Sequence, residues 1–319
     1  MRAIVVARHG GPEVLELQER PEPEPGRGQL LVDVEAAGVN YRDVYEREGG
    51  YAGEAPLVAG IEGAGTVAAV GEGVADIAAG DRVGWVAAPG SYAERAVVEA
   101  AKAVPVPADV SSEVAAAVLL QGMTAQYLAC ATYPVQEGDS VLVHAAAGGV
   151  GLLLTQIVRL RGGRVLATTS TDDKARLARE AGAAETIGYA GFGERVRELT
   201  GGEGVAAVYD GVGAATFDES VASLRPRGVM VLYGAASGPV PGVETATLAQ
   251  RSLFFTRPTL VHYTLTREEL LARAGDLFGW IASGRLDVRI GGRYPLADAR
   301  RAHEDLEARR TTGKLVLVP

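Results

Sequence analysis

A glycine-rich turn between two apolar segments places the strongest constraint on what this chain can fold into. Residues 140–157 read SVLVHAAAGGVGLLLTQI, which is an apolar strand, a turn of small residues and an apolar helix. From residue 140 onward, strand-like and helix-like segments alternate, and the strands are continuously apolar. This pattern predicts a parallel sheet that helices cover on both faces. We therefore expect a doubly wound α/β domain in this part of the chain.

The segments on either side have a different pattern of apolar and turn-forming residues. Residues 1–110 contain short apolar runs broken by Gly, Pro and Asp, which predict a β-rich barrel or irregular sheet. After about residue 256 the alternation ends, and a helix with a Thr266–Glu269 capping box, a second helix and a terminal strand follow. We expect three stretches: a β-rich domain over 1–120, a doubly wound domain over 121–255, and a return to the first domain over 256–319.

Composition excludes several classes of protein. The net charge of −9 argues against a nucleic-acid binder, which usually carries a basic domain or stripe. The single cysteine, Cys130, excludes disulfides within the chain and cysteine-rich zinc sites. The sequence shows no apolar run of the ~20 residues that span a bilayer and no signal peptide at its start. A cytoplasmic protein is expected.

The glycine-rich turn has the setting of an anion-binding loop. Backbone N–H groups at a helix start attract anions, and small residues allow a phosphate to approach the main chain. In the pattern G-x-G-x-x-G the three positions fall on Ala146, Gly148 and Gly151, so alanine replaces the first glycine. The strand–turn–helix context predicts that a dinucleotide places its pyrophosphate here. A close packing turn without a ligand is the alternative.

The segment after the next strand selects between the two nicotinamide dinucleotides. NAD sites usually place Asp or Glu ~20 residues beyond the glycine motif, where it binds the ribose. Here the strand ends in Thr-Thr-Ser, closing with Ser170, and Asp172 and Asp173 come later, where they can cap the next helix. Hydroxyl groups and the nearby Lys174 would attract a 2′-phosphate that a carboxylate would repel. The segment predicts NADP(H), with an ordinary solvated lysine as the alternative for Lys174.

Several motifs together resemble those of one superfamily. The motifs are AGVNYRDVYEREGGY, VAGIEGAGTVAAVG, GDRV, AAAGGVG, YDGVG and TTGKLVLV. In this order, and over essentially the full chain, the sequence resembles the medium-chain dehydrogenase/reductase superfamily, and most closely its zinc-free quinone oxidoreductase (zeta-crystallin-like) branch. The resemblance implies a GroES-like catalytic domain, an inserted Rossmann domain and a cleft between them.

The resemblance also bears on zinc. Zinc alcohol dehydrogenases of this superfamily carry metal ligands at the positions that are Asn40, Ile61 and Gln121 here. Zinc needs several nitrogen or sulfur ligands, so no metal is predicted, and the four scattered histidines are expected at the surface or satisfied in the core. Without a Lewis acid, alcohol oxidation is disfavoured. A quinone needs little acid catalysis, so NADPH held against it could reduce it.

The resemblance implies roles for individual residues. Asn40, Tyr45 and Tyr51 are the implied catalytic residues, the first two at the nicotinamide and Tyr51 where enoyl-thioester reductases carry a comparable tyrosine. Asn40 as a turn residue and the tyrosines as packing residues are the alternatives, and Tyr189 could be a core strand residue. The implied cofactor-binding residues are Asn40, Thr124, Ala147, Gly148, Gly149, Val150, Ser170, Lys174, Tyr189, Tyr233, Arg257 and Lys314.

Three functions remain open at this stage. The first is an NADPH:quinone reductase. The second is an NADPH-dependent enoyl or alkenal C=C reductase, which needs a proton donor such as Tyr51. The third is a non-enzymatic crystallin-like or RNA-binding role. A homodimer through the apolar stretch SLFFTRPTLV (252–261) at the Rossmann sheet edge is also expected, with burial against the chain's own catalytic domain as the alternative.

Overall fold

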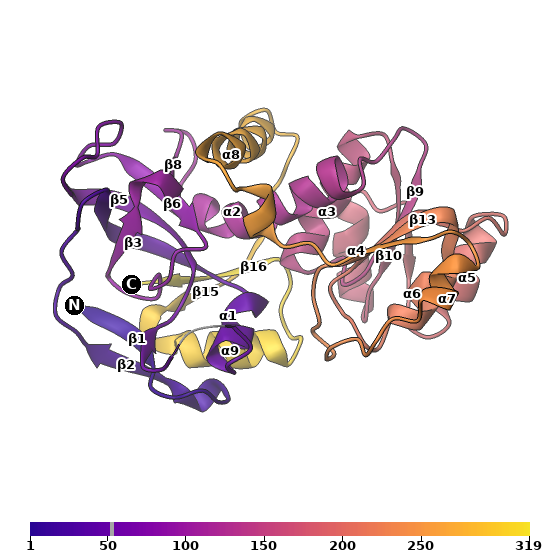
Figure 1. Cartoon of the computed structure of the whole chain (residues 1–319), viewed down its shortest axis with the longest axis horizontal. Helices are drawn as coiled ribbons and strands as arrows, with labels where there is room; N and C mark the ends of the chain where they lie inside the picture. The colour runs from indigo at the N-terminus through magenta and orange to yellow at the C-terminus, as the bar shows by residue number, and fades with distance from the viewer. Residues whose placement is uncertain (52–53) are drawn as a thin grey trace. The chain divides into compact units, whose positions relative to one another are not determined.

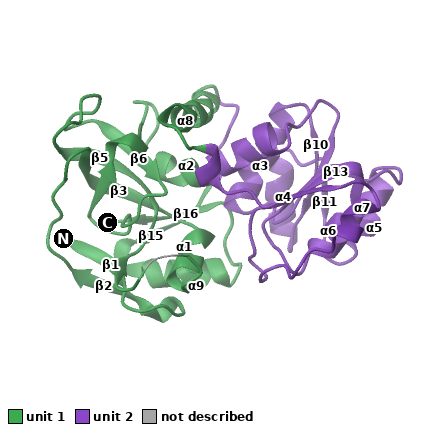
Figure 2. Ribbon diagram, in the orientation of Figure 1, with its two compact units in different colours: residues 1–120, 264–283, 288–319 green, residues 121–263, 284–287 purple. Residues whose placement is uncertain are grey.

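The chain folds into two compact units. The structure, a computed structural model, describes residues 1–51 and 54–319. Unit 1 contains residues 1–120, 264–283 and 288–319, and unit 2 contains residues 121–263 and 284–287 (Figure 2). The return to unit 1 therefore begins at residue 264 and not at the expected 256, because β14 (Phe254–Thr256) still pairs with the sheet of unit 2.

A second difference from the expected boundaries is the short segment 284–287. It belongs to unit 2, although the chain on both sides of it belongs to unit 1. The side chain of Gln156 fastens it: its amide donates to the Asp287 carbonyl at 3.0 Å and its oxygen accepts the Asp287 N–H at 2.8 Å.

Unit 1 is built on mostly antiparallel strands. One sheet has the order β15-β16-β3-β5-β6-β8, with β7 pairing with β3, and a second has the order β2-β1-β4. Among the described strands of unit 1, β15 and β16 alone pair in parallel. The strands are β1 (Arg2–Val6), β2 (Leu15–Glu19), β3 (Gln29–Val39), β4 (Leu57–Val58), β5 (Glu62–Val70), β6 (Arg82–Val86), β7 (Arg95–Glu99), β8 (Ala103–Pro105), β15 (Ile290–Pro295) and β16 (Lys314–Val318).

Three helices lie wholly within unit 1. They are α1 (Tyr41–Arg47), α8 (Arg267–Ala282) and α9 (Ala299–Glu307), and α1 lies beside α9 (Figure 1). The expected capping box of α8 is present: Thr266 accepts from the Glu269 N–H at 3.1 Å, and Glu269 accepts from the Thr266 N–H.

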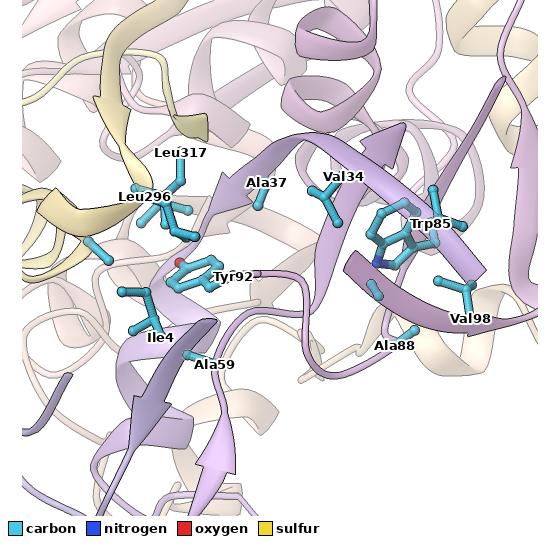
Figure 3. Close-up of a cluster of buried hydrophobic side chains, with 14 of the residues drawn as sticks. Ile4, Val34, Ala37, Ala59, Trp85, Ala88, Tyr92, Val98, Leu296 and Leu317 are labelled. Carbon is cyan, nitrogen blue, oxygen red and sulfur yellow. The ribbon is translucent and has the colours of Figure 1, made fainter. Parts of the chain in front are cut away.

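The core of unit 1 contains two large aromatic side chains. Trp85 lies near Val98 and Ala88, and Tyr92 lies near Ile4, Leu296 and Leu317 (Figure 3). Both aromatic residues are fully buried, and each has a polar atom that needs a partner. The Trp85 indole donates to Ser91 Oγ at 2.8 Å, and the Tyr92 hydroxyl joins the polar network described below.

Unit 2 contains the predicted parallel sheet. Its strand order is β11-β10-β9-β12-β13-β14, and every neighbouring pair is parallel. The order reverses between β9 and β12, and in such sheets ligands bind outside the carboxyl ends of the strands at this point. The strands are β9 (Ser140–Val143), β10 (Arg164–Thr168), β11 (Glu185–Ile187), β12 (Val205–Asp210), β13 (Leu224–Leu232) and β14.

The helices of unit 2 alternate with its strands, as the sequence predicts. They are α3 (Gly149–Leu160), α4 (Asp172–Glu180), α5 (Phe192–Leu199), α6 (Phe217–Ala222) and α7 (Thr245–Ala249). The segment FDESVASLRP (217–226), whose pattern predicts a helix, is helical only in its first part. Leu224 already pairs with Val205, and Pro226 disfavours a helical conformation in the residue before it.

The remaining helix, α2 (Ser112–Tyr127), continues as a π-helical turn over Leu128–Thr132. The combined stretch of 21 residues has a mean hydropathy of 1.4 and passes the length and composition test for a membrane span. This corrects the expectation that no run reaches that length. Core helices pass the same test, and 72% of the window is buried inside the structure.

The glycine loop contains one unusual backbone conformation, and it is not at a glycine. Ala145 has a φ of +49°, in the left-handed region that costs a non-glycine residue roughly 1–2 kcal/mol. Ala146 has no positive φ, so alanine is tolerated where the G-x-G-x-x-G pattern has its first glycine. Gly151 meets a different requirement, because an added Cβ would collide with the Ala145 carbonyl oxygen and lie 2.6 Å from Ala146 Cα.

We therefore expect Gly151→Ala to destabilise unit 2, by about 1–3 kcal/mol, since the start of α3 would have to move away from the loop. Urea unfolding followed by circular dichroism measures the effect. Gly275→Ala is the matched control: Gly275 is exposed within α8, nothing lies within 4 Å of an added Cβ, and alanine there should be neutral or stabilising by up to ~1 kcal/mol. Equal stability of Gly151→Ala and the wild type would contradict the close-approach interpretation.

Candidate active site

The glycine loop lies at the carboxyl end of β9, where the strand order of unit 2 reverses. Gly148 is the N-cap of α3 and is extended, and the first bond of the helical ladder joins the Leu152 N–H to the Gly148 carbonyl at 3.0 Å. The N–H groups of Gly149, Val150 and Gly151 precede that bond. At a helix start such groups lack intrahelical acceptors and favour an anion. The residues present therefore fit a pyrophosphate.

Two aromatic side chains fasten the beginning of this loop. The Tyr189 hydroxyl accepts the Ala145 N–H at 3.0 Å, and its ring stacks on His144 with the ring centroids 6.2 Å apart. His144 is fully buried between the hydroxyls of Thr168 and Ser220, each at 2.8 Å. Burial lowers the pKa of His144 to about 4, against the raising effect of the Asp210 carboxylate, so the ring is neutral at pH 7. Tyr189 is thus joined to the loop that we expect to hold the phosphates.

The end of β10 presents the residues predicted to select the dinucleotide. Ser170 is exposed and Lys174 half-buried, on either side of the start of α4. Thr171 is the N-cap of α4, since its hydroxyl accepts the Lys174 N–H at 3.3 Å. Asp172 and Asp173 therefore occupy the first turn and do not cap the helix, as the sequence had suggested they could. A helix start adds a favourable field for an anion at this edge.

The YDGVG motif builds the neighbouring loop at the carboxyl end of β12. The fully buried Asp210 accepts the N–H groups of Val212 at 2.7 Å and Gly213 at 3.0 Å, and the Thr216 hydroxyl at 2.7 Å. Tyr233, which follows β13, packs against this loop: an added Cβ on Gly211 would lie 2.9 Å from the Tyr233 ring. The motif therefore shapes the edge of the sheet beside the glycine loop.

The other predicted cofactor residues of unit 2 lie in different places. Thr124 is buried within α2. Ala147 is buried, and it directly precedes the N-cap of α3. Arg257 is exposed and follows β14, at the opposite edge of the sheet from β10 and β11. The structure therefore brings together Gly148, Ser170, Lys174 and Tyr189 along one half of the sheet edge but places Arg257 away from them.

In unit 1, Asn40 is buried in a charged cluster. Its Oδ1 accepts from Lys314 Nζ at 2.6 Å, and its Nδ2 donates to Glu62 Oε2 at 2.9 Å and to the Gly38 carbonyl at 3.2 Å. Lys314 Nζ also contacts Glu62 Oε2 at 2.6 Å, and the second carboxylate oxygen of Glu62 accepts the Leu120 N–H at 2.6 Å. Because lysine only donates and a carboxylate only accepts, the orientation of the Asn40 amide is determined.

This geometry gives Lys314 a different role from the one that the resemblance implied. Its side chain is 1% exposed, and its ammonium is bonded to Glu62 and Asn40. A cofactor phosphate needs an accessible cation, so direct phosphate binding by Lys314 is disfavoured. Asn40 is likewise buried, and its amide nitrogen donates within the cluster, to Glu62 and to the Gly38 carbonyl. Sequence reasoning missed Glu62 as the third member, although the GIE segment contains it.

A second buried network extends from the same helix. The Asn40 N–H donates to Asp43 Oδ2 at 2.8 Å, as part of the capping box at the start of α1. The Tyr92 hydroxyl donates to the same oxygen at 2.8 Å. Burial raises the pKa of Asp43 to about 7, although these two hydrogen bonds oppose the shift. Asp43 lies within the AGVNYRDVYEREGGY motif but was not singled out, and none of the quoted motifs contains Tyr92.

The network reaches α9 through the buried His303. Arg47 NH1 lies 3.2 Å from His303 Nδ1, and the Tyr92 hydroxyl lies 3.2 Å from His303 Nε2. A guanidinium only donates, so Nδ1 accepts and the ring proton is on Nε2, which donates to the Tyr92 oxygen. Burial, and then the charge of Arg47, lower the pKa of His303 to about 3. Arg47 in turn donates to Glu307 at 2.6 Å.

The predicted tyrosines form an aromatic group at and after α1. Tyr45 lies between Tyr41 and Tyr51, at centroid distances of 5.5 and 6.5 Å. Tyr51 is 42% exposed, and the guanidinium carbon of Arg42 lies 3.4 Å from the centre of its ring. This stacking is close enough for a cation–π interaction. The structure thus groups Tyr45 with Tyr51, and it adds Tyr41 and Arg42, which the sequence did not single out.

The residues at the expected metal positions do not fit zinc. Asn40 is an amide bonded to an ammonium, and Ile61 is a buried hydrocarbon. Zinc is bound by thiolate, imidazole and carboxylate groups. Over residues 1–51 and 54–319, no group of three or more His, Cys, Asp or Glu side chains is arranged to hold a metal ion.

Comparisons with known proteins agree with this arrangement. The alcohol dehydrogenase GroES-like domain matches residues 26–108, and the zinc-binding dehydrogenase family matches residues 149–278. A quinone oxidoreductase from Pseudomonas aeruginosa is 46% identical over 100% of this chain and 99% of its own length. A 2-haloacrylate reductase from a Burkholderia species is 40% identical over 99% and 98%. A mycobacterial protein solved in complex with NADPH is 54% identical, with a TM-score of 0.98 and full coverage of both chains.

The depressed pKa of His303 has a measurable consequence for stability. Between about pH 3 and 6.5 the unfolded chain binds a proton at this histidine and the folded chain does not, so acidification destabilises the fold by about 1.4 kcal/mol per pH unit. In His303→Gln this contribution is absent, so the variant should lose less stability than the wild type between pH 6.5 and 4.5. The contribution of Asp43 to the pH dependence of stability has the opposite sign, because its pKa is raised in the folded chain. Asp43 is present in both the wild type and His303→Gln.

Urea unfolding at several pH values measures the two slopes. His262→Gln is the control, because it removes an exposed histidine of unit 2 that lies outside the network of Arg47, Tyr92 and His303. Identical slopes for the wild type and His303→Gln would show that His303 is not held neutral in the folded chain.

Proposed function

The chain belongs to the medium-chain dehydrogenase/reductase superfamily, in its zinc-free quinone oxidoreductase branch, and on this basis we propose that it is an NADPH-dependent quinone reductase. The observation that carries the proposal is the buried Lys314–Glu62 pair at Asn40. The Lys314 ammonium is bonded to both Asn40 and Glu62, so neither side chain is available to bind a metal ion for alcohol oxidation. The protein must then rely on orientation of its two substrates.

The edge of the unit 2 sheet supports NADPH as the cofactor. Bound there, NADPH supplies the reducing equivalents. Gly149 and Val150 at the start of α3 would bind the pyrophosphate, as would Ala147 and Gly148 just before it. Ser170 and Lys174 would bind the 2′-phosphate, and Tyr189 would hold the loop and the adenosine. Tyr233 would line the same edge, and Thr124 and Arg257 stay predictions from resemblance.

The aromatic group at α1 supports an acceptor with a flat ring. Tyr45 and the exposed ring of Tyr51 offer apolar faces, and aromatic rings pack on such faces in offset or tilted arrangements. The guanidinium of Arg42 adds hydrogen-bond donors beside Tyr51. A quinone carbonyl accepts hydrogen bonds, and its reduction requires little proton transfer from the protein in the rate-determining step.

A C=C reductase is the second candidate, and two observations favour it. Tyr51 is exposed, so its hydroxyl could donate a proton to a substrate carbon. The relative from Burkholderia, which is 40% identical to this chain, is named a 2-haloacrylate reductase. An RNA-binding role has less support because the net charge is −9, and a purely structural, crystallin-like role has less support because the cofactor loop is intact.

We expect NADPH oxidation to be fast with benzoquinones and naphthoquinones and at least tenfold slower, in kcat/KM, with alkenals, haloacrylates and enoyl thioesters. Tyr51→Phe should reduce quinone turnover by no more than about threefold, because the hydroxyl is not needed as an acid there. Steady-state kinetics at 340 nm with each acceptor measures both effects. Fast turnover of the C=C substrates that Tyr51→Phe abolishes, together with poor quinone turnover, would favour the second candidate.

We also expect NADPH to bind more tightly than NADH, and Lys174→Ala to reduce that preference by roughly tenfold, since an ammonium–phosphate contact contributes about 1.5–3 kcal/mol. Fluorescence titration of each nucleotide gives the dissociation constants. Lys102→Ala is the matched control, because Lys102 is an exposed lysine of unit 1 paired with Glu99. Equal affinity of the wild type for both nucleotides would contradict the assignment of Ser170 and Lys174.

Unit 2 also offers a surface for a homodimer. β14 is an edge strand of the sheet, and Phe254 on it is 62% exposed. An edge strand presents backbone groups that can pair with a second copy. We propose that two copies associate here, and light scattering of the purified protein would show the mass of one chain if this is wrong.

A further inference from the structure

We infer that Lys314 and Glu62 are positioning residues that act on the acceptor site through Asn40 and α1, in place of the cofactor contact expected for Lys314. The inference rests on the proposed function, since it assigns these residues a part in the reduction of the acceptor. It concerns residues of unit 1 alone.

The first step is that Lys314, Asn40 and Glu62 all contact one another. Lys314 Nζ contacts Asn40 Oδ1 and Glu62 Oε2, each at 2.6 Å, and Asn40 Nδ2 completes the triangle to Glu62 at 2.9 Å. Glu62 is 0% exposed and Lys314 1%. Buried charges of this kind are costly unless every group is paired with good geometry, and here each charge has two or more partners.

The second step is the use of lysine at this position. Lysines account for three of the 31 basic residues of the chain, at 102, 174 and 314, and the rest are arginines. Gly38 explains why a compact ammonium is required. An added Cβ on Gly38 would collide with Glu62 Oε2 and the Ala116 carbonyl and lie 2.8 Å from Lys314 Cε. The lysine chain therefore packs closely against the Gly38 backbone, and a compact ammonium fits such a closely packed cluster better than the planar, larger guanidinium.

The third step connects the cluster to the acceptor site. Asn40 is the residue at which β3 ends and α1 begins, and its backbone N–H is bound by Asp43 in the capping box. Its side chain is bound by β5 through Glu62 and by β16 through Lys314. The start of α1 is therefore fixed to two strands, and α1 carries Tyr45, one residue of the proposed acceptor site.

A displacement of α1 by a fraction of an ångström to 1 Å would move Tyr45 relative to the acceptor, and misplacements of that size cost up to about 100-fold in rate. We expect the binding of NADPH by unit 2 to change little, because Lys174 lies at the start of α4 in unit 2, outside the Asn40–Glu62–Lys314 cluster of unit 1. The inference therefore predicts a loss in acceptor turnover that is separate from cofactor affinity.

Two variants separate positioning from stability. Lys314→Met leaves Glu62 buried without its counter-ion, so its melting temperature should fall by more than about 5 °C. The double variant Lys314→Met/Glu62→Gln removes both charges, and the new amide can still accept the Leu120 N–H. We expect it to regain most of the lost stability, to bind NADPH within twofold of the wild type, and to lose at least tenfold in kcat with a quinone acceptor.

Hydrogen–deuterium exchange of the peptide covering residues 38–48 gives a readout that does not require activity. In the double variant the amides of α1 should exchange at least tenfold faster than in the wild type, because the Lys314 ammonium no longer joins Asn40 to β16. Lys102→Met/Glu99→Gln, which removes an exposed lysine–glutamate pair of the same unit, should change neither exchange nor kcat.

The outcomes are distinguishable. A double variant with wild-type kcat and wild-type exchange of α1 would overturn the inference and show that the ion pair is only structural. If the wild type reduces no quinone, the proposed function fails, and fast exchange of α1 in the double variant would still support the positioning of α1 by Lys314.

Discussion

Glu62 is a carboxylate with no exposure to solvent, and much of unit 1 is arranged around the need to satisfy it. A buried charge must be neutralised and hydrogen-bonded, because the loss of hydration is otherwise not compensated. Its partners come from three distant parts of the chain: Asn40 at the end of β3, the Leu120 N–H on α2, and Lys314 at the start of β16. This single requirement joins the central strands of the sheet and determines where α1 begins.

Much of the fold could be predicted from the sequence because its determinants are local. The apolar strands, the glycine loop and the Thr266–Glu269 capping box each depend on residues a few positions apart, and the structure contains all of them. The four histidines show how far such local prediction reaches. The sequence predicted surface or satisfied core positions, and His144 and His303 are indeed buried with partners on both nitrogens. Which partners they have could not be inferred.

The contacts that the sequence did not predict are long-range. Asn40 bonds residues 22 and 274 positions away, and His303 lies within hydrogen-bonding distance of Arg47, 256 positions away. Neither periodicity nor a motif encodes such pairings, since they follow only from the strand order β15-β16-β3-β5 and from α1 beside α9. For this reason resemblance assigned Lys314 to the cofactor, whereas the geometry points to Asn40. The backbone of the glycine loop was not predicted either. The strained residue is Ala145, whereas Ala146, the alanine at the first glycine position of the motif, has no positive φ.

The discontinuity of unit 1 has a consequence for how the chain acquires its site during synthesis. Residues 121–263 of unit 2 form one nearly uninterrupted segment and can complete their sheet while the rest is still being made, since domains fold as units from the N-terminus. Unit 1 begins first but finishes last, because β16 must pair with β3 and its lysine must reach Glu62. Until β16 has been synthesised, Glu62 has no counter-ion. The Asn40–Glu62–Lys314 cluster is therefore completed only after residues 121–263 of unit 2 have been synthesised.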